Sequence, residues 1–270
     1  MKGADVVALR DQLSARDIAI LESLRAHRLA TTTQIRRLHF DEHAISVEAA
    51  RRATARVLLR LEGHRLVSRL AQRIGGVRRG SDGLTWQLAS RGDRLLAVMR
   101  GADKRRRYIE TGTAFAQHTI GVTDLAIELQ LAVRAGDLEQ VTVETEPRCW
   151  RHFTGAHAAK EILKPDLYVK TAMGEFEDHW WIEFDLETEH PSTVTKKARV
   201  YLRYAANGAQ QRATGVFPVA LWVVPTQARQ DALQRAFRQM RDISPGMFRV
   251  TTRSAFMATI LAGADPAAGP

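Results

Sequence analysis

The N-terminal part of the chain carries apolar residues at helical spacing. Ile18, Leu21 and Leu24 recur three residues apart, and Ser14 precedes them as a cap for the helix that they define. The threonines at 31–33 can cap a short second helix. The pattern therefore predicts two helices, each opened by a hydroxyl side chain.

A third and longer predicted helix carries a row of arginines. It begins after Ser46 and places Val57, Leu58 and Leu61 on its apolar side. Four candidate DNA-contacting residues lie on the other side: Arg51, Arg52, Arg56 and Arg60. An arginine fork can bind a phosphate or a guanine edge with two hydrogen bonds.

Two short strands are predicted after these helices, over 66–70 and 84–88. The segment between them, 72–83, is rich in glycine and arginine and predicts a long hairpin tip. Its candidate DNA-contacting residues are Arg73, Arg78 and Arg79. Three helices followed by a strand, a basic loop and a strand are the order of a winged helix-turn-helix, in which the third helix enters the major groove.

The charge distribution agrees with a nucleic-acid partner. Residues 1–110 hold 23 of the 40 Lys and Arg residues and 12 of the 30 Asp and Glu residues, a net charge of +11. The remaining 17 and 18 give −1, so the whole excess of +10 lies in the first part of the chain. Such a block favours a phosphate backbone as partner. The alternatives are a solvated arginine face and a winged helix that contacts protein.

The composition excludes several classes of protein. Hydrophobic residues make up 45% and charged residues 26% of the chain, as in ordinary globular proteins. The single cysteine, Cys149, excludes a disulfide framework and a Cys-rich zinc site. No run of 18 apolar residues and no phosphate loop ending in Gly-Lys-Ser/Thr occurs. We expect a cytoplasmic protein without a membrane partner and without ATP.

The C-terminal half predicts an α/β domain. A long buried helix comes first, and three strands, a helix, a strand, a helix and a final short strand follow it. The ranges are 113–135, 141–146, 163–171, 179–187, 193–206, 217–224, 228–241 and 248–251.

Candidate chemistry lies on the second and third of these strands. Side chains alternate across a strand, so adjacent strands would bring Asp166, Glu183 and Asp185 together, with Lys170 and Glu187 nearby. Clustered carboxylates repel one another unless a cation or a proton intervenes. Mg²⁺ or Mn²⁺ suits such oxygen ligands, and water bound to the metal can attack a phosphodiester. The alternative is a polar sheet face that binds DNA or a partner.

This arrangement resembles the PD-(D/E)xK nuclease fold. Asp166 follows Pro165, and Glu183-Phe184-Asp185 comes 17 residues later on an apolar strand. The resemblance implies an α/β class, α+β overall, with a winged helix-turn-helix before an α-β-β-β-α-β core like that of restriction endonucleases. Asp185 stands where that pattern has Lys. Three lysines are candidates to replace it: Lys170, Lys196 and Lys197.

A narrower resemblance covers most of the chain. Residues 183–189 (EFDLETE), with 164–166 (KPD) before them and 197–201 (KARVY) after them, resemble the replication-relaxation family of plasmids and integrative elements. His118 and Asp124 in the preceding helix also fit its pattern. The resemblance implies a DNA-binding protein that acts in plasmid replication or DNA relaxation, with nicking as its candidate reaction.

Several residues are secondary candidates for the site. Asp124 could add a metal ligand that His118 orients, although a buried His-Asp pair is an equal interpretation. Tyr201 could act as a nucleophile, but the histidines show no ligand spacing to support this. Glu187 and Glu189 belong to the acidic segment of the family resemblance.

The sequence therefore predicts a winged helix over 1–100, a basic linker over 101–112, a nuclease-like domain over 113–260 and a disordered tail over 261–270. Two functions stay open: an endonuclease or nickase that uses Mg²⁺ or Mn²⁺, and a non-catalytic DNA-binding regulator or accessory factor. Double-stranded DNA is the expected partner. A second copy of the chain and the replication or transfer proteins of the same element are further candidate partners.

Overall fold

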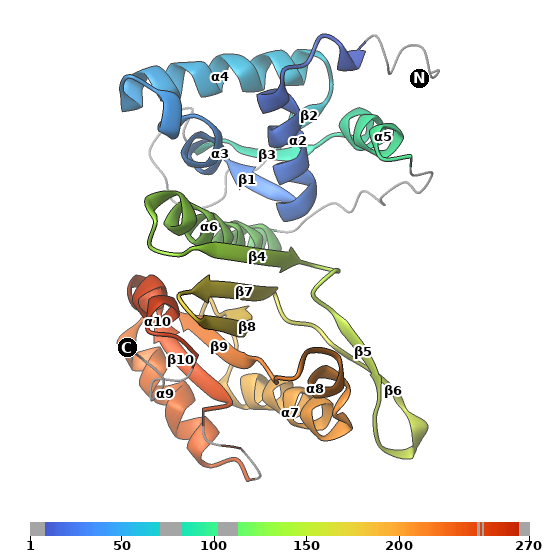
Figure 1. Ribbon diagram of the computed structural model, residues 1–270, viewed down its shortest axis with the longest axis vertical. Coiled ribbons are helices and arrows are strands. Elements are labelled where there is room, and N and C mark those ends of the chain that lie inside the picture. The colour runs from blue at the N-terminus through green and yellow to red at the C-terminus, as the bar shows by residue number, and fades with distance from the viewer. Residues whose placement is uncertain (1–8, 71–82, 102–112, 242–243, 245, 265–270) are drawn as a thin grey trace. The chain divides into compact units, whose positions relative to one another are not determined.

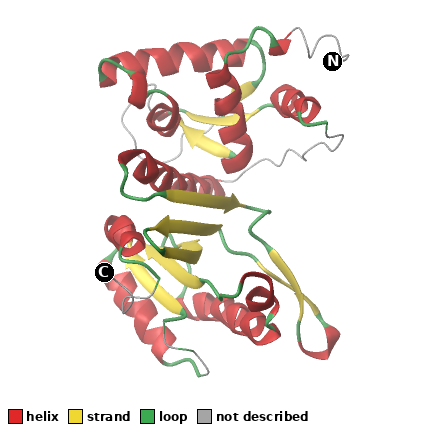
Figure 2. Cartoon of the chain, viewed as in Figure 1, coloured by secondary structure: helices red, strands yellow, loops and turns green. Residues whose placement is uncertain are grey.

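The computed structural model describes residues 9–70, 83–101, 113–241, 244 and 246–264 (Figure 1). The chain divides into two compact units, Met1–Ile127 and Glu128–Pro270. The division falls inside α6 (Thr113–Ala135), the helix predicted over 113–135. The tip of the predicted wing, the predicted linker after Gly101 and the tail after residue 264 lie outside the described residues. Each unit combines helices and strands, so the class is mixed α/β (Figure 2).

The described part of the first unit contains the three predicted helices and both predicted strands. Its elements are α2 (Ala15–His27), β1 (Leu29–Thr31), α3 (Thr32–His39), η1 (Asp41–His43), α4 (Val47–Gly63), β2 (Val67–Arg69), β3 (Thr85–Leu88), α5 (Ser90–Met99) and the beginning of α6. β3 lies in the centre of an antiparallel sheet of order β1-β3-β2. β1 was not predicted, because three residues are too short to show alternation.

Hydroxyl caps fix where the helices begin, as the sequence predicts. Ser14 and Asp17 form a capping box in which each side chain binds the other residue's backbone N–H. Thr31 and Gln34 form a second box at α3, and the Ser46 side chain accepts from Ala49 at α4. These bonds satisfy backbone donors that a helix cannot pair internally.

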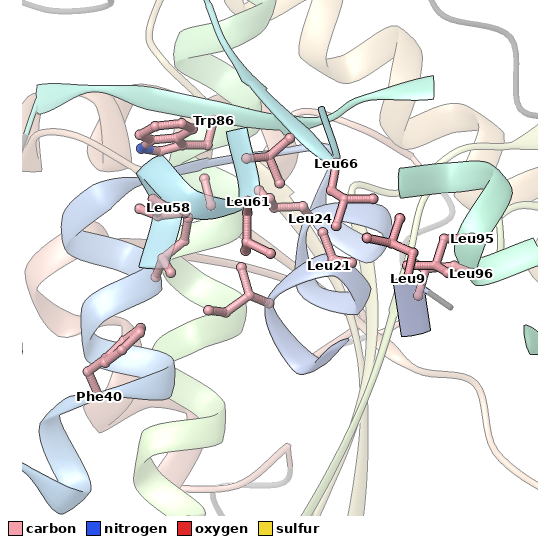
Figure 3. Packing of buried hydrophobic residues seen from close by; sticks show 14 of the residues in the cluster. Leu9, Leu21, Leu24, Phe40, Leu58, Leu61, Leu66, Trp86, Leu95 and Leu96 are labelled. Carbon is pink, nitrogen blue, oxygen red and sulfur yellow. The ribbon is translucent and has the colours of Figure 1, made fainter. Parts of the chain in front are cut away.

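The core of the first unit orients α4. Figure 3 shows Leu58 and Leu61 of α4 among the buried leucines of α2 and beside Trp86 of β3. The Trp86 indole nitrogen donates to the Thr32 hydroxyl over 2.9 Å, which satisfies the polar atom of this buried ring. Burial of this stripe turns the opposite side of α4 toward solvent.

The second unit is built on a five-stranded mixed sheet of order β10-β9-β8-β7-β4. Its strands are β4 (Gln140–Thr145), β7 (Leu167–Met173), β8 (Phe176–Phe184), β9 (Val219–Val224) and β10 (Phe248–Thr252). β7 is antiparallel to both of its neighbours, β4 and β8, whereas β8, β9 and β10 are parallel. The connection from β8 to β9 therefore crosses one face of the sheet, as parallel neighbours require.

Helices α7 (Pro191–Asn207) and α9 (Gln227–Arg238) cover one face of this sheet. Trp181 of β8 packs against Tyr201 and Tyr204 of α7, and Trp222 of β9 packs against Phe237 of α9. The short helix α8 (Ala209–Thr214) follows α7, and η4 (Arg253–Ala255) and α10 (Phe256–Leu261) follow β10. The sequence did not predict α8 or α10. No helix among the described residues combines the length and apolarity that crossing a membrane would need.

The strand predicted over 163–171 is two strands in the structure. Leu163 ends β6 (Lys160–Leu163), which pairs with β5 (Arg151–Thr154) in a separate hairpin that carries η3 (Ala156–Ala158) between its strands. The sheet strand β7 begins only at Leu167. Pro165 has no N–H to offer a ladder, which explains the interruption.

The strand predicted over 179–187 lies three residues earlier. β8 pairs with β7 through a tight hairpin around Gly174, so it begins at Phe176 and ends at Phe184. Glu187 has a φ of +61°, outside the strand conformation. The expectation that Glu187 shares a strand face with Glu183 is therefore wrong.

Candidate functional site

The outer face of α4 carries exposed arginines. Arg52 and Arg56 stand one turn apart and are exposed. Within the described part of the chain, neither guanidinium has a hydrogen-bond or ion-pair partner. Exposed Leu59 continues the same face toward the end of the helix. The first unit thus presents two unneutralised cations side by side.

The other predicted DNA-contacting arginines differ from this pair. Arg60 binds the buried carboxylate of Asp17 over 2.6 Å, so it links α4 to α2. Arg51 is half-buried. Arg73, Arg78 and Arg79 lie outside the described residues. Their role in DNA contact stays a prediction.

In the second unit, adjacent strands bring Asp166 and Glu183 together, as the alternation of side chains predicts. Leu167 pairs with Ile182, so Asp166 comes directly opposite Glu183. Both carboxylates are buried. Asp166 also accepts the backbone N–H of Phe184 over 2.7 Å, which fixes the carboxylate at the junction of the two strands.

Helix α7 contributes a cation and a hydroxyl to this pair. The Lys197 ammonium donates to one oxygen of Glu183, and the Tyr201 hydroxyl donates to the other. Lys197 and Tyr201 lie one helical turn apart, so they face the strand together. The predicted lysine Lys197 therefore contacts the predicted carboxylate.

Burial changes the proton affinities in this cluster. Loss of solvent, helped by the nearby Asp166, raises the pKa of Glu183 to about 7, although Lys197 and Tyr201 pull it down. Burial alone would lower the pKa of Lys197, but the charges of Glu183 and Asp166 raise it instead. Burial and the neighbouring Glu183 raise the pKa of Tyr201 well above its ordinary value. Tyr201 is thus held protonated, as a hydrogen-bond donor.

Asp185 has a different partner, which the sequence did not reveal. Its carboxylate accepts the Arg229 side chain over 2.7 Å, with both side chains less than a tenth exposed. The same carboxylate accepts the Glu187 backbone N–H, and Arg229 also donates to the Glu189 carbonyl. Arg229 therefore holds the loop that follows β8.

The remaining predicted residues lie elsewhere. Lys170 pairs with Glu177 over 2.9 Å. It lies opposite His179, four residues along the chain from Asp166, and therefore does not reach Glu183. The Glu187 carboxylate accepts the Thr226 hydroxyl over 3.3 Å.

Asp124 belongs to the first unit, where Arg37 of α3 binds it over 3.2 Å. His118 is half-buried on α6 in the same unit.

The predicted metal site can be tested against this donor set. Both oxygens of Glu183 are engaged by Lys197 and Tyr201, and both oxygens of Asp185 by Arg229 and the Glu187 N–H. Among the residues that the structure describes, no three His, Cys, Asp or Glu side chains form a group able to hold a metal ion. In this arrangement the cluster does not fit Mg²⁺ or Mn²⁺, because Lys197 and Arg229 already occupy the oxygens of Glu183 and Asp185 that would bind the metal.

Two contributors were missed by sequence reasoning. Arg229 lies 44 residues from Asp185, and a helical arginine gives no signal of such a pairing. Glu146, which follows β4, adds to the negative potential at Lys197. Its position at the end of the strand predicted over 141–146 was the available signal.

These features define a two-unit α/β protein. The first unit exposes cations on a helix, and the second encloses a charged cluster beside its mixed sheet. The chain belongs to the replication-relaxation family, whose family model matches residues 21–220. Membership indicates a role in plasmid or mobile-element replication or relaxation. No curated protein and no solved structure matches the chain.

Proposed function

We propose that this protein binds duplex DNA through a winged helix-turn-helix formed by its first unit. The observation that carries the proposal is the outer face of α4, where Arg52 and Arg56 are exposed without partners among the described residues. Duplex DNA offers phosphates and guanine edges that such arginines bind. Action at plasmid or mobile-element DNA agrees with the family.

The order of elements supports this use of α4. α2, α3 and α4 are followed by β2 and β3, and β1 joins the sheet in the order β1-β3-β2. In a winged helix-turn-helix the third helix is the one that enters the major groove. Here that helix is α4, and its buried stripe leaves the arginine face outward.

A duplex-binding measurement tests the proposal. Arg52→Ala with Arg56→Ala should weaken duplex binding and lower the salt dependence of log K by about 1.8, roughly 0.9 for each lost phosphate contact. The control is Arg10→Ala with Arg100→Ala, which removes two positive charges elsewhere in the unit. Equal losses in the two double variants, or none in the first, would contradict the assignment.

A second candidate function is endonuclease activity in the second unit, in a PD-(D/E)xK-like arrangement. Asp166 and Glu183 lie together at the junction of adjacent strands, with Lys197 in contact with Glu183. The order of elements also supports a PD-(D/E)xK-like fold, because the antiparallel neighbours β4, β7 and β8 are followed by α7 and then by β9, which is parallel to β8. The internal neutralisation of Glu183 and Asp185 favours the non-catalytic alternative, in which this unit binds a partner.

Supercoiled plasmid separates the two candidates. For a nuclease, the protein with Mg²⁺ or Mn²⁺ should give relaxed or linear product that EDTA abolishes and Asp166→Ala does not make. Intact plasmid with a mobility shift, under all these conditions, would leave DNA binding as the function and remove cleavage.

A further inference from the structure

The net charge of residues 111–270 conceals a basic layer in the second unit. Residues 111–270 carry a net charge of −1, but residues 191–241 hold nine Lys and Arg and one Asp, a net charge of +8. The rest of that segment therefore carries −9. The basic residues belong to α7, α8, α9 and their connections, the helical layer over one face of the sheet (Figure 1).

Part of this charge is neutralised inside the protein. Lys197 binds Glu183, Arg203 binds Glu161 and Arg229 binds Asp185. The exposed remainder consists of Lys196, Arg199, Arg212, Arg235, Arg238 and Arg241. None of these six has an ion-pair partner within the described part of the chain. The helical layer thus presents excess positive charge to solvent.

A groove between α7 and α9 gathers some of these cations. It has a volume of about 780 Å³ and is open to solvent. Arg199 and Arg203 of α7 and Arg241 after α9 line it, together with Leu202 and Met240. Of the described residues that line the groove, none is acidic. The groove therefore combines arginines with an apolar surface.

We propose that this groove binds single-stranded DNA. Arginine forks match the phosphodiester anion, and the exposed Arg199 and Arg241 have no ion-pair partner among the described residues. Leu202 and Met240 offer an apolar surface against which the faces of unpaired bases can be removed from water. A duplex exposes phosphates and sugars but hides its base faces, so the apolar lining favours a single strand over a duplex.

This surface is separate from the arginine face of α4 and does not depend on the proposed winged helix. On α7, the side that lines the groove also differs from the side that contacts the carboxylate cluster. Lys197 and Tyr201 point to the strands, whereas Thr195, Arg199 and Leu202 form the side that lines the groove. The inference adds a second nucleic-acid surface to the chain.

The full-length protein with a fluorescent oligothymidylate tests the inference. Arg199→Ala with Arg241→Ala should weaken single-strand binding roughly tenfold. It should also lower the salt dependence of log K by about 1.4, that is about 0.7 for each lost phosphate contact. Both side chains are exposed, so the melting temperature should stay that of the wild type, which circular dichroism can check.

Two comparisons decide the outcome. Arg134→Ala with Arg148→Ala removes the same charge from exposed positions outside the groove and should leave single-strand binding near that of the wild type. Arg52→Ala with Arg56→Ala should lose duplex binding but keep oligothymidylate binding. Unchanged binding in the groove variant, or an equal loss in the Arg134 and Arg148 control, would overturn the inference. Duplex binding reports separately on the proposed winged helix.

Discussion

At the scale of single residues, burial decides the chemistry of Glu183. This side chain is 3% exposed, and it meets Lys197 and Tyr201 of α7 and Asp166 just before β7. A buried carboxylate that lacks solvent keeps its proton more tightly unless nearby cations compensate fully. The pKa of about 7 indicates that compensation here is partial.

This raised pKa predicts a pH-dependent stability. Folded protein binds the Glu183 proton more tightly than unfolded protein does, so the contribution is fully present below the ordinary pKa of about 4.5. It is lost as pH rises through about 7, at a total on the order of 3 kcal/mol. Urea unfolding at pH 5 and pH 8 should show this loss in the wild type and a smaller one in Glu183→Gln.

A matched control distinguishes the burial of Glu183 from a general charge effect. Glu161→Gln removes a carboxylate that pairs with exposed Arg203 at the surface. Its pH profile should follow that of the wild type. If Glu183→Gln lost as much unfolding free energy between pH 5 and pH 8 as the wild type does, the carboxyl group of Glu183 would not set the pH dependence.

At the scale of secondary-structure elements, close backbone approach determines how α5 sits on the first unit. The backbone N–H of Ala89, just before α5, donates to the Leu66 carbonyl over 2.9 Å. At Gly92, an added Cβ would lie 2.2 Å from the same carbonyl oxygen and 2.7 Å from the Leu88 side chain. The absence of a side chain at residue 92 is therefore what allows the helix to dock.

Gly92→Ala should consequently destabilise the protein, by about 1–3 kcal/mol or more, because the contacted atom belongs to the backbone and cannot move aside. Gly63→Ala is the control, since a Cβ at the end of α4 meets no atom within 4 Å. It should be neutral or stabilising by up to about 1 kcal/mol. Free energies of unfolding from urea titrations compare the two. Equal effects at both positions would contradict the docking argument.

At the scale of the whole chain, the net charge of a long segment does not show where charged surfaces lie in the fold. The excess of +11 in residues 1–110 was visible in the sequence, and the exposed arginines of α4 belong to it. The layer of +8 over residues 191–241 was hidden, because the acidic segment before it, residues 111–190 with a net charge of −9, cancels it in the total. The first surface is the one proposed to bind duplex DNA, and the second is the one proposed to bind single-stranded DNA.

The sequence by itself determined the local structure. Capping residues such as Ser14 and Thr31, and the apolar periodicity of α4 and α6, act within a few residues and are legible without a fold. Alternation along strands also predicted that Asp166 would meet Glu183. The observed register confirms this, whereas a shift by one residue would have turned the two side chains to opposite faces of the sheet.

Only the tertiary structure decided which charges meet. Lys197 rather than Lys170 contacts Glu183, because α7 crosses back over the strands, whereas Lys170 lies in the middle of β7 opposite His179 and pairs with Glu177. Asp185 pairs with Arg229 because α9 packs beside the loop after β8. Such contacts join residues tens of positions apart, and their energies depend on burial that no local pattern encodes. Local hydrogen bonding fixes elements, whereas the packing of these elements fixes the site.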